Sequence, residues 1–139
     1  MWIVYALLSA VFAAAVSILA KIGMEGVNSS LATAVRTVVV LVMAWGLVLA
    51  LGLQGGLAKM TPRNWWFLAL SGFATGLSWL CYYAALQRGD ASRVNPVDKS
   101  SVVLAILFAF LFLREKPTPG VLLGGALITA GTFVLVFWK

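Results

Sequence analysis

The sequence predicts an all-α integral membrane protein with five transmembrane helices. Of its 139 residues, 63% are hydrophobic and only 10% are charged, whereas soluble domains are roughly 45–50% apolar and about 25% charged. The apolar residues fall in five runs, each near the length of about 20 residues that a helix needs to cross a bilayer. We therefore expect a single membrane domain over residues 1–139.

The five spans are expected at residues 2–22, 31–53, 64–86, 95–113 and 119–137. The first run lacks the basic start of a signal peptide and is longer than a typical signal-peptide core, so we interpret it as a retained span. The connections between the spans are short, which makes neighbouring helices antiparallel. An odd number of spans places the two termini on opposite sides of the membrane.

Local signals support the ends of these spans. Asn28 can cap the start of the second helix. Pro62 suits the first turn of the third helix, and Trp65 and Trp66 follow it at the level of an interfacial aromatic belt. Residues 54–61, with two consecutive glycines, are expected to form a loop.

Composition also excludes several functions. The net charge of +6 comes from Lys and Arg residues that stand singly or in pairs, which is typical of membrane anchors and not of a nucleic-acid surface. The chain has one cysteine, Cys81, and no histidine, so it lacks an intramolecular disulfide, a thiolate metal cluster and histidine-based catalysis. With only four acidic residues, we expect no enzyme, no cofactor and no metal site.

Basic residues divide almost evenly between the two sides of the membrane. The side of the N-terminus carries Lys59, Arg63, Arg114 and Lys116. The opposite side carries Lys21, Arg88, Arg93 and Lys139, and also Arg36 and Lys99 near helix ends. The positive-inside rule thus has little bias to act on. Two topologies remain open: a single orientation with a cytoplasmic C-terminus, or dual topology with copies inserted both ways.

Two cations lie inside predicted spans. Arg36 stands about six residues into the second helix, and Lys99 about four residues into the fourth. Inserting a charged side chain into a membrane costs roughly 2.5–3.5 kcal/mol at the centre of a helix. Charged residues within spans are therefore functional candidates by default. Either side chain could instead reach the headgroups. Thr33 and Thr37 beside Arg36 suggest a polar interior, and Lys99 in a first turn would oppose the helix dipole.

Acidic and amide side chains near these cations have two interpretations. Asn95 can cap the fourth helix with Pro96 at its first position, and Asp98 then stands where a carboxylate favours exposed amides. Alternatively, Asp98 or Glu25 pairs with Lys99 or Arg36 and titrates as a substrate binds. Glu25 is otherwise a solvated loop residue.

Polar-tipped residues are concentrated on the third helix: Thr75, Ser78, Trp79, Tyr82 and Tyr83. Thr75, Trp79 and Tyr82 share one helical face by spacing. Such groups can line a cavity for an organic solute, or they can pack between helices or join the aromatic belt. Small residues predict close helix packing, and they include Gly72, Gly76, Gly120, Gly124 and Gly131.

Residues 81–96, CYYAALQRGDASRVNP, and residues 110–118, FLFLREKPT, carry a family pattern. With the glycine-rich last helix, they resemble the EamA-type repeat of the drug/metabolite transporter superfamily. That repeat reads Tyr-x-x-Ala-Leu-x-x-Gly-x-Ala-x-x-Val-x-Pro, then Phe-Leu-Gly-Glu. The resemblance covers all five helices, and Arg114 stands where the repeat commonly has glycine.

The resemblance implies half of an inverted-repeat, ten-helix transporter, because most members fuse two repeats of opposite topology. A short form of one repeat is expected to work as a homodimer, with the second copy antiparallel. The expected function is metabolite export or uptake by alternating access, with substrate contacts from Arg36, Ser78, Trp79, Tyr82, Tyr83, Asn95 and Lys99. The expected partners are membrane lipid, a small-molecule substrate and a second copy, in a prokaryotic inner membrane. The alternative function is a non-transporting membrane subunit or a lipid-organising bundle.

Overall fold

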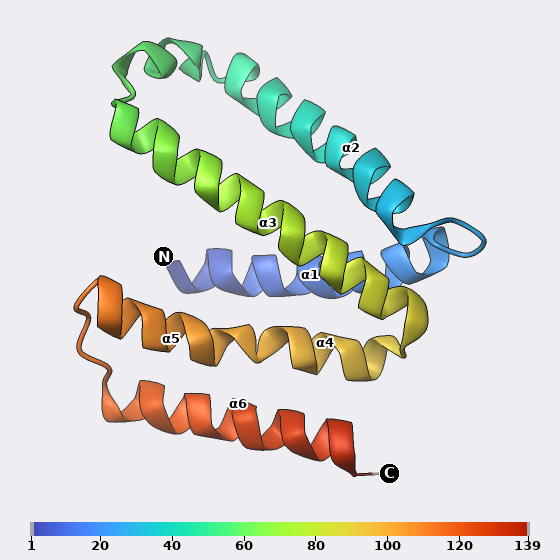
Figure 1. Ribbon diagram of the computed structural model, residues 1–139. Helices are drawn as coiled ribbons and strands as arrows, with labels where there is room; N and C mark the ends of the chain where they lie inside the picture. The colour runs from blue at the N-terminus through green and yellow to red at the C-terminus, as the bar shows by residue number, and fades with distance from the viewer. Residues whose placement is uncertain (1, 139) are drawn as a thin grey trace. The chain divides into compact units, whose positions relative to one another are not determined.

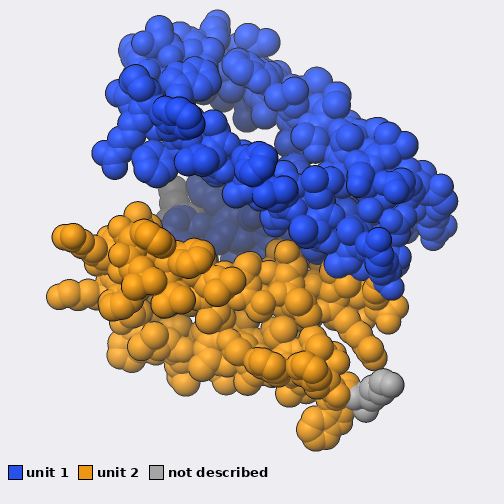
Figure 2. Space-filling model, in the orientation of Figure 1, with its two compact units in different colours: residues 1–88 blue, residues 89–139 orange. Residues whose placement is uncertain are grey.

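The computed structural model describes residues 2–138 of the chain. Within these residues the secondary structure is helical, without a β-strand. Five helical segments are long and apolar enough to cross a membrane: Trp2–Gly23, Ser29–Ala50, Pro62–Arg88, Ala91–Phe112 and Pro119–Phe137. The prediction of an all-α chain with five spans is confirmed. The chain divides into two compact units, unit 1 (residues 1–88) and unit 2 (residues 89–139), shown in Figure 2.

Unit 1 contains α1 (Trp2–Gly23), α2 (Ser29–Ala50), the 3₁₀ helix η1 (Leu53–Lys59) and α3 (Pro62–Arg88). In Figure 1, α2 and α3 run antiparallel with η1 at their junction, and α1 and α2 both contact α3. Glycines reverse the chain at both connections, with φ of 74° at Gly26 and 67° at Gly52, values that side-chain-bearing residues rarely adopt. The Asn28 side chain accepts a hydrogen bond from the Ser30 amide at 2.9 Å, and α2 begins there.

The buried residues of unit 1 gather at one end of its helices. They lie where α1 ends, α2 begins and α3 ends, and they are Ser17, Met24, Ser29, Thr33, Tyr83 and Leu86. Two side chains tie this end together. The Lys21 ammonium donates to the Leu86 carbonyl at 2.6 Å, and the Gln87 amide donates to the Val27 carbonyl at 2.7 Å. We call this the closed end of unit 1.

Unit 2 contains α4 (Ala91–Lys99), α5 (Ser101–Phe112) and α6 (Pro119–Phe137). Both α4 and α5 contact α6 (Figure 1). The Thr118 hydroxyl accepts a hydrogen bond from the Val121 amide at 3.4 Å, and Pro119 occupies the first turn of α6. Arg114, in the turn before α6, has a φ of 55°. This left-handed backbone explains why a glycine suits that position in the related repeat.

The fourth span differs from the prediction in two ways. It begins at Ala91, because the Asp90 carbonyl already accepts hydrogen bonds from the Arg93 and Val94 amides. Asn95 and Pro96 are therefore interior residues of α4, and the prediction that Asn95 caps this helix and Asp98 lies in its first turn is wrong. The helix is interrupted at Ser100, where one amide is shared between the carbonyls of Pro96 and Val97, both at 3.1 Å.

Other bounds differ from the prediction by a few residues. Residues 54–61, predicted as a loop, belong largely to η1, since a 3₁₀ turn needs few residues and tolerates glycine. The second span begins at Ser29 and the third at Pro62, each two residues before the predicted start. Element ends are the least certain part of any sequence pattern, because helix caps depend on individual hydrogen bonds.

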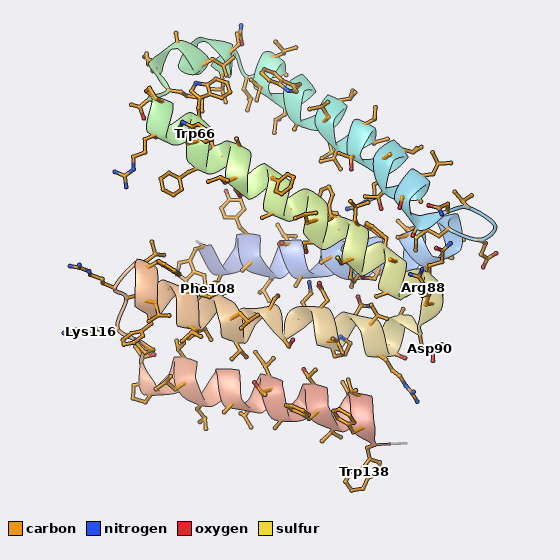
Figure 3. The ribbon with its side chains drawn as sticks, viewed as in Figure 1. Trp66, Arg88, Asp90, Phe108, Lys116 and Trp138 are labelled. Carbon is orange, nitrogen blue, oxygen red and sulfur yellow. The ribbon has the colours of Figure 1, made fainter. Side chains whose placement is uncertain are left out.

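Side chains along the helices are mainly apolar and exposed, as expected for surfaces that face lipid. Figure 3 labels Trp66 in the first turns of α3 and Arg88 at its last residue. It also labels Lys116 in the turn before α6 and Trp138 after it. Charged and amphipathic side chains thus mark helix ends, as at membrane interfaces. The length and composition of the five helices therefore indicate a multi-pass membrane protein, independently of the family pattern.

Candidate functional site

Arg36 is held between two aromatic rings of α3. Its Cζ lies 4.7 Å from the ring centroid of Trp79 and 5.1 Å from that of Tyr83. Arg36 follows the first residue of α2 by about 10 Å along the helix. Trp79 and Tyr83 lie about 13 Å and 8 Å before the end of α3, at 1.5 Å per residue. The guanidinium is therefore positioned inside the span by cation–π contacts, and it does not extend to the end of either helix.

The guanidinium of Arg36 has unused hydrogen-bond donors. Its Nη1 is buried and lacks a hydrogen-bond partner among residues 2–138. Glu25 is the sole carboxylate in residues 1–88; it is exposed in the turn after α1 and forms no ion pair with Arg36. An arginine carries five N–H donors, and a buried donor without an acceptor is costly. This side chain is the candidate anion-binding group of unit 1.

A groove of about 590 Å³ opens beside Arg36 between α1 and α2. Its wall is apolar apart from Arg36 and the Tyr83 ring, and its lining residues are Val16, Leu19, Ala20, Gly23, Met24, Val27, Leu31, Ala32, Val35, Arg36, Val39 and Tyr83. Ligand sites are commonly apolar cavities of about 300–1,000 Å³ with a few placed polar groups. The groove thus combines a ligand-sized apolar space with one cation.

The aromatic residues predicted to act together separate into two places. Trp79 and Tyr83 lie against Arg36, whereas the Tyr82 hydroxyl lies 2.8 Å from the Ser17 hydroxyl of α1. The Tyr82 and Tyr83 rings still touch edge to face, with centroids 5.2 Å apart. Ser78 is exposed on α3. Spacing on one helix gives the direction of each side chain, but the neighbour that it meets depends on another helix.

Lys99 and Asp98 form an ion pair in unit 2. The ammonium lies 3.3 Å from the carboxylate, and the two side chains are 61% and 32% exposed. The span Ala91–Phe112 has 22 residues, which makes a helix about 33 Å long. Lys99 lies about 12 Å along it from Ala91. The pair is therefore close to the middle of a span and open on its outer side.

The interruption of the helix lies directly beside this pair. Ser100 separates α4 from α5, and its hydroxyl donates to the Val97 carbonyl at 2.6 Å. Pro96 lacks the amide hydrogen that would bond to the Ser92 carbonyl in the preceding turn, and the Pro96 carbonyl also accepts a hydrogen bond from the Thr132 hydroxyl of α6 at 3.3 Å. Asn95 is half-buried on the same helix. Pro96 and the adjacent serines were signals for this break that the sequence interpretation did not use.

The glycines predicted for helix packing make few contacts within the chain. A side chain added at Gly72, Gly76, Gly124 or Gly131 would meet no atom within 4 Å, and one at Gly120 would meet only the nearby Thr118 hydroxyl oxygen at 4.0 Å. Gly125, in the same glycine-rich helix, is packed: a Cβ there would lie 3.4 Å from Ile106 Cδ1. Close helix contact at glycine inside unit 2 therefore occurs at Gly125.

Residues 2–138 bring together no group of three His, Cys, Asp or Glu side chains that could hold a metal ion. Among residues 2–138, charged groups with close partners include the Lys99–Asp98 pair, and Arg36 with its two aromatic neighbours. Both arrangements suit recognition of charge. Neither one has the nucleophile and base geometry of a hydrolytic centre.

Comparisons with known proteins identify a family and two relatives. A profile of the EamA-like transporter family matches residues 1–137. The chain is 48% identical over 134 residues to an uncharacterized transporter in the cobO 3′ region of Sinorhizobium sp., covering 96% of this chain and 95% of that protein. It is 26% identical over 129 residues to an uncharacterized transporter of Synechocystis sp. (strain ATCC 27184 / PCC 6803 / Kazusa), covering 91% of this chain but 37% of that protein.

No solved structure matches the chain. The resemblance identified from residues 81–96 and 110–118 is nevertheless confirmed by the family match, and the 139-residue length fits the short form of one repeat. The chain belongs to the EamA-like transporter family.

Proposed function

We propose that two copies of this chain, inserted in opposite orientations, form a transporter that moves a small organic or amphipathic metabolite by alternating access. The membrane is the inner membrane of a bacterium, as the bacterial relatives suggest. In this assembly the two protomers enclose the pathway, and each contributes Arg36 and Lys99. The nearly even distribution of basic residues between the two sides supports dual topology.

The observation that carries this proposal is the exposed Lys99–Asp98 pair near the middle of a span. Hydrocarbon is a poor solvent for such a pair, so residues of this kind face a bundle interior or a water-filled cavity. The exposed side of Lys99 is accordingly assigned to the pathway between the two copies.

Two further features support a paired assembly. The Synechocystis relative is more than twice as long as this chain, since 129 aligned residues are 37% of its length; such a chain has room for a second unit of this size. Gly72 and Gly76 on α3 also present a surface without close neighbours in the protomer. Small residues of this spacing allow another helix to approach closely.

The test is solute flux into proteoliposomes that contain the purified protein. Lys99→Gln removes the charge at the proposed pathway and is expected to abolish flux while dimers persist in chemical cross-linking. Lys116→Gln is the matched control, because Lys116 lies in the turn between α5 and α6, and it is expected to leave flux unchanged. Full flux in Lys99→Gln would overturn the pathway assignment, and absence of flux for every solute class would favour a non-transporting membrane subunit.

A further inference from the structure

We propose that the groove between α1 and α2 binds a monocarboxylate with an apolar body, with Arg36 as the residue that pairs with the carboxylate. This inference rests on the proposed function and deepens it by naming the class of solute. Its site lies wholly within unit 1, because every lining residue belongs to residues 16–83.

The charge of the groove favours a single negative charge on the ligand. Arg36 is the one charged residue among those that line it. A carboxylate would balance the guanidinium one to one, whereas a doubly charged phosphate would bring a second charge into an apolar space with nothing to compensate it. A neutral solute could accept a hydrogen bond but would leave the charge of the guanidinium uncompensated.

The guanidinium of Arg36 is already positioned. Trp79 and Tyr83 fix the guanidinium from α3, and an aromatic face attracts a cation without accepting the directed hydrogen bonds that a carboxylate accepts. Nη1 has no hydrogen-bond partner within residues 2–138. Because the planar guanidinium is held in place before binding, little conformational freedom remains to be lost when a carboxylate arrives.

Size and depth distinguish a solute from a lipid headgroup. The volume of about 590 Å³ fits a small organic molecule. Arg36 lies about 10 Å from the start of α2, and its rings come from residues about 8–13 Å inside the end of α3. Lipid phosphates lie at the bilayer surface, outside the hydrocarbon core, so a carboxylate that enters with its solute reaches this depth more readily than a headgroup.

The experiment measures equilibrium binding by calorimetry to the full chain in phosphatidylcholine nanodiscs. The probes are 4-phenylbutyrate, its neutral analogue 4-phenylbutanamide and the dianionic 4-phenylbutyl phosphate. The carboxylate is expected to bind at least about tenfold more tightly than the amide, because a hydrogen bond to a charged group changes affinity by a factor of that size. It is also expected to bind more tightly than the phosphate. Equal affinity for the carboxylate and the amide would overturn the assignment, as would a preference for the phosphate.

Variants locate the site. Arg36→Gln is expected to reduce affinity for the carboxylate to that of the amide, and Arg36→Lys is expected to restore part of the difference because it keeps the charge without the planar fork. Arg63→Gln is the matched control, since the Arg63 guanidinium lies over the exposed Phe67 ring at 5.7 Å, outside the groove. Wild-type affinity in a folded Arg36→Gln protein would overturn the proposal.

Lipid competition and solute flux distinguish the remaining outcomes. If phosphatidylglycerol in the nanodiscs displaces the carboxylate competitively, the groove is a lipid site and the proposal is wrong. If 4-phenylbutyrate binds as expected but no solute flux occurs, the proposed function fails and the groove assignment stands. If flux of neutral or cationic solutes occurs without carboxylate binding, the groove assignment fails and the proposed function stands.

Discussion

Arg36 in unit 1 and Lys99 in unit 2 are both cations well inside a membrane span, yet their surroundings differ. Arg36 lies between two rings, with a buried nitrogen that has no hydrogen-bond partner in the described chain. Lys99 is 61% exposed and is paired with the adjacent Asp98. A membrane-embedded charge must be compensated. The comparison indicates two different solutions: unit 1 reserves its cation for an incoming anion, and unit 2 neutralises its cation within the chain.

The helices that carry the two cations differ in the same sense. α2 is continuous over 22 residues, and Arg36 lies near the closed end of unit 1, where Lys21 and Gln87 bind backbone carbonyls. The span that carries Lys99 is interrupted at the next residue. A continuous helix in a hydrogen-bonded corner suits a fixed binding group, whereas at Ser100 one amide is shared between two carbonyls.

The largest expected effect concerns water at Lys99. In a Cys81→Ser background, Lys99→Cys is expected to react with a water-soluble methanethiosulfonate on the order of a hundredfold faster than Leu104→Cys, because the reactive thiolate forms only where water is present. Leu104 is the matched position, since it lies on the same span and is 54% exposed. The measurement is the rate of modification in proteoliposomes. Equal rates would show that Lys99 faces the same medium as a lipid-facing leucine.

The second effect concerns the closed end of unit 1. Lys21→Met removes the donor to the Leu86 carbonyl and is expected to lower the free energy of unfolding by roughly 1.5–3 kcal/mol, as for other hydrogen bonds to charged groups. Lys59→Met, in the exposed η1 helix, is expected to change it by less than about 0.5 kcal/mol. Unfolding in detergent micelles measures both. Similar losses in the two variants would mean that polar contacts do not hold this end.

The smallest expected effect separates the two adjacent tyrosines. Tyr82→Phe removes a hydroxyl that lies 2.8 Å from the Ser17 hydroxyl, and we expect a loss near 0.6 kcal/mol, the average for such bonds between membrane helices. Tyr83→Phe keeps the ring over which Arg36 lies, and no hydrogen bond joins the Tyr83 hydroxyl to another of residues 2–138. We expect almost no change there. The reverse order in the same unfolding measurement would contradict this placement of the two side chains.

Sequence reasoning predicted the five spans because each is an apolar run of sufficient length, and that property is local. It did not predict the break at Ser100, because Pro96 was interpreted as the first residue of the helix and not as an interior residue before a break. It selected Arg36, Trp79 and Tyr83 one by one. It could not predict that these three residues lie together while Tyr82 lies apart from them. The contact of Arg36 with the two rings joins residues more than 40 positions apart in the chain, and it depends on how α2 approaches α3.

Labelling of the termini tests the central claim, that the working unit is two inverted copies, most directly. A cysteine is appended to either end of a Cys81→Ser protein, and intact cells are treated with an impermeant maleimide before and after permeabilisation. We predict that each terminus is labelled in part before permeabilisation and completely after it, because both orientations are present. Labelling of one terminus only, with the other wholly protected in intact cells, would contradict the inverted assembly.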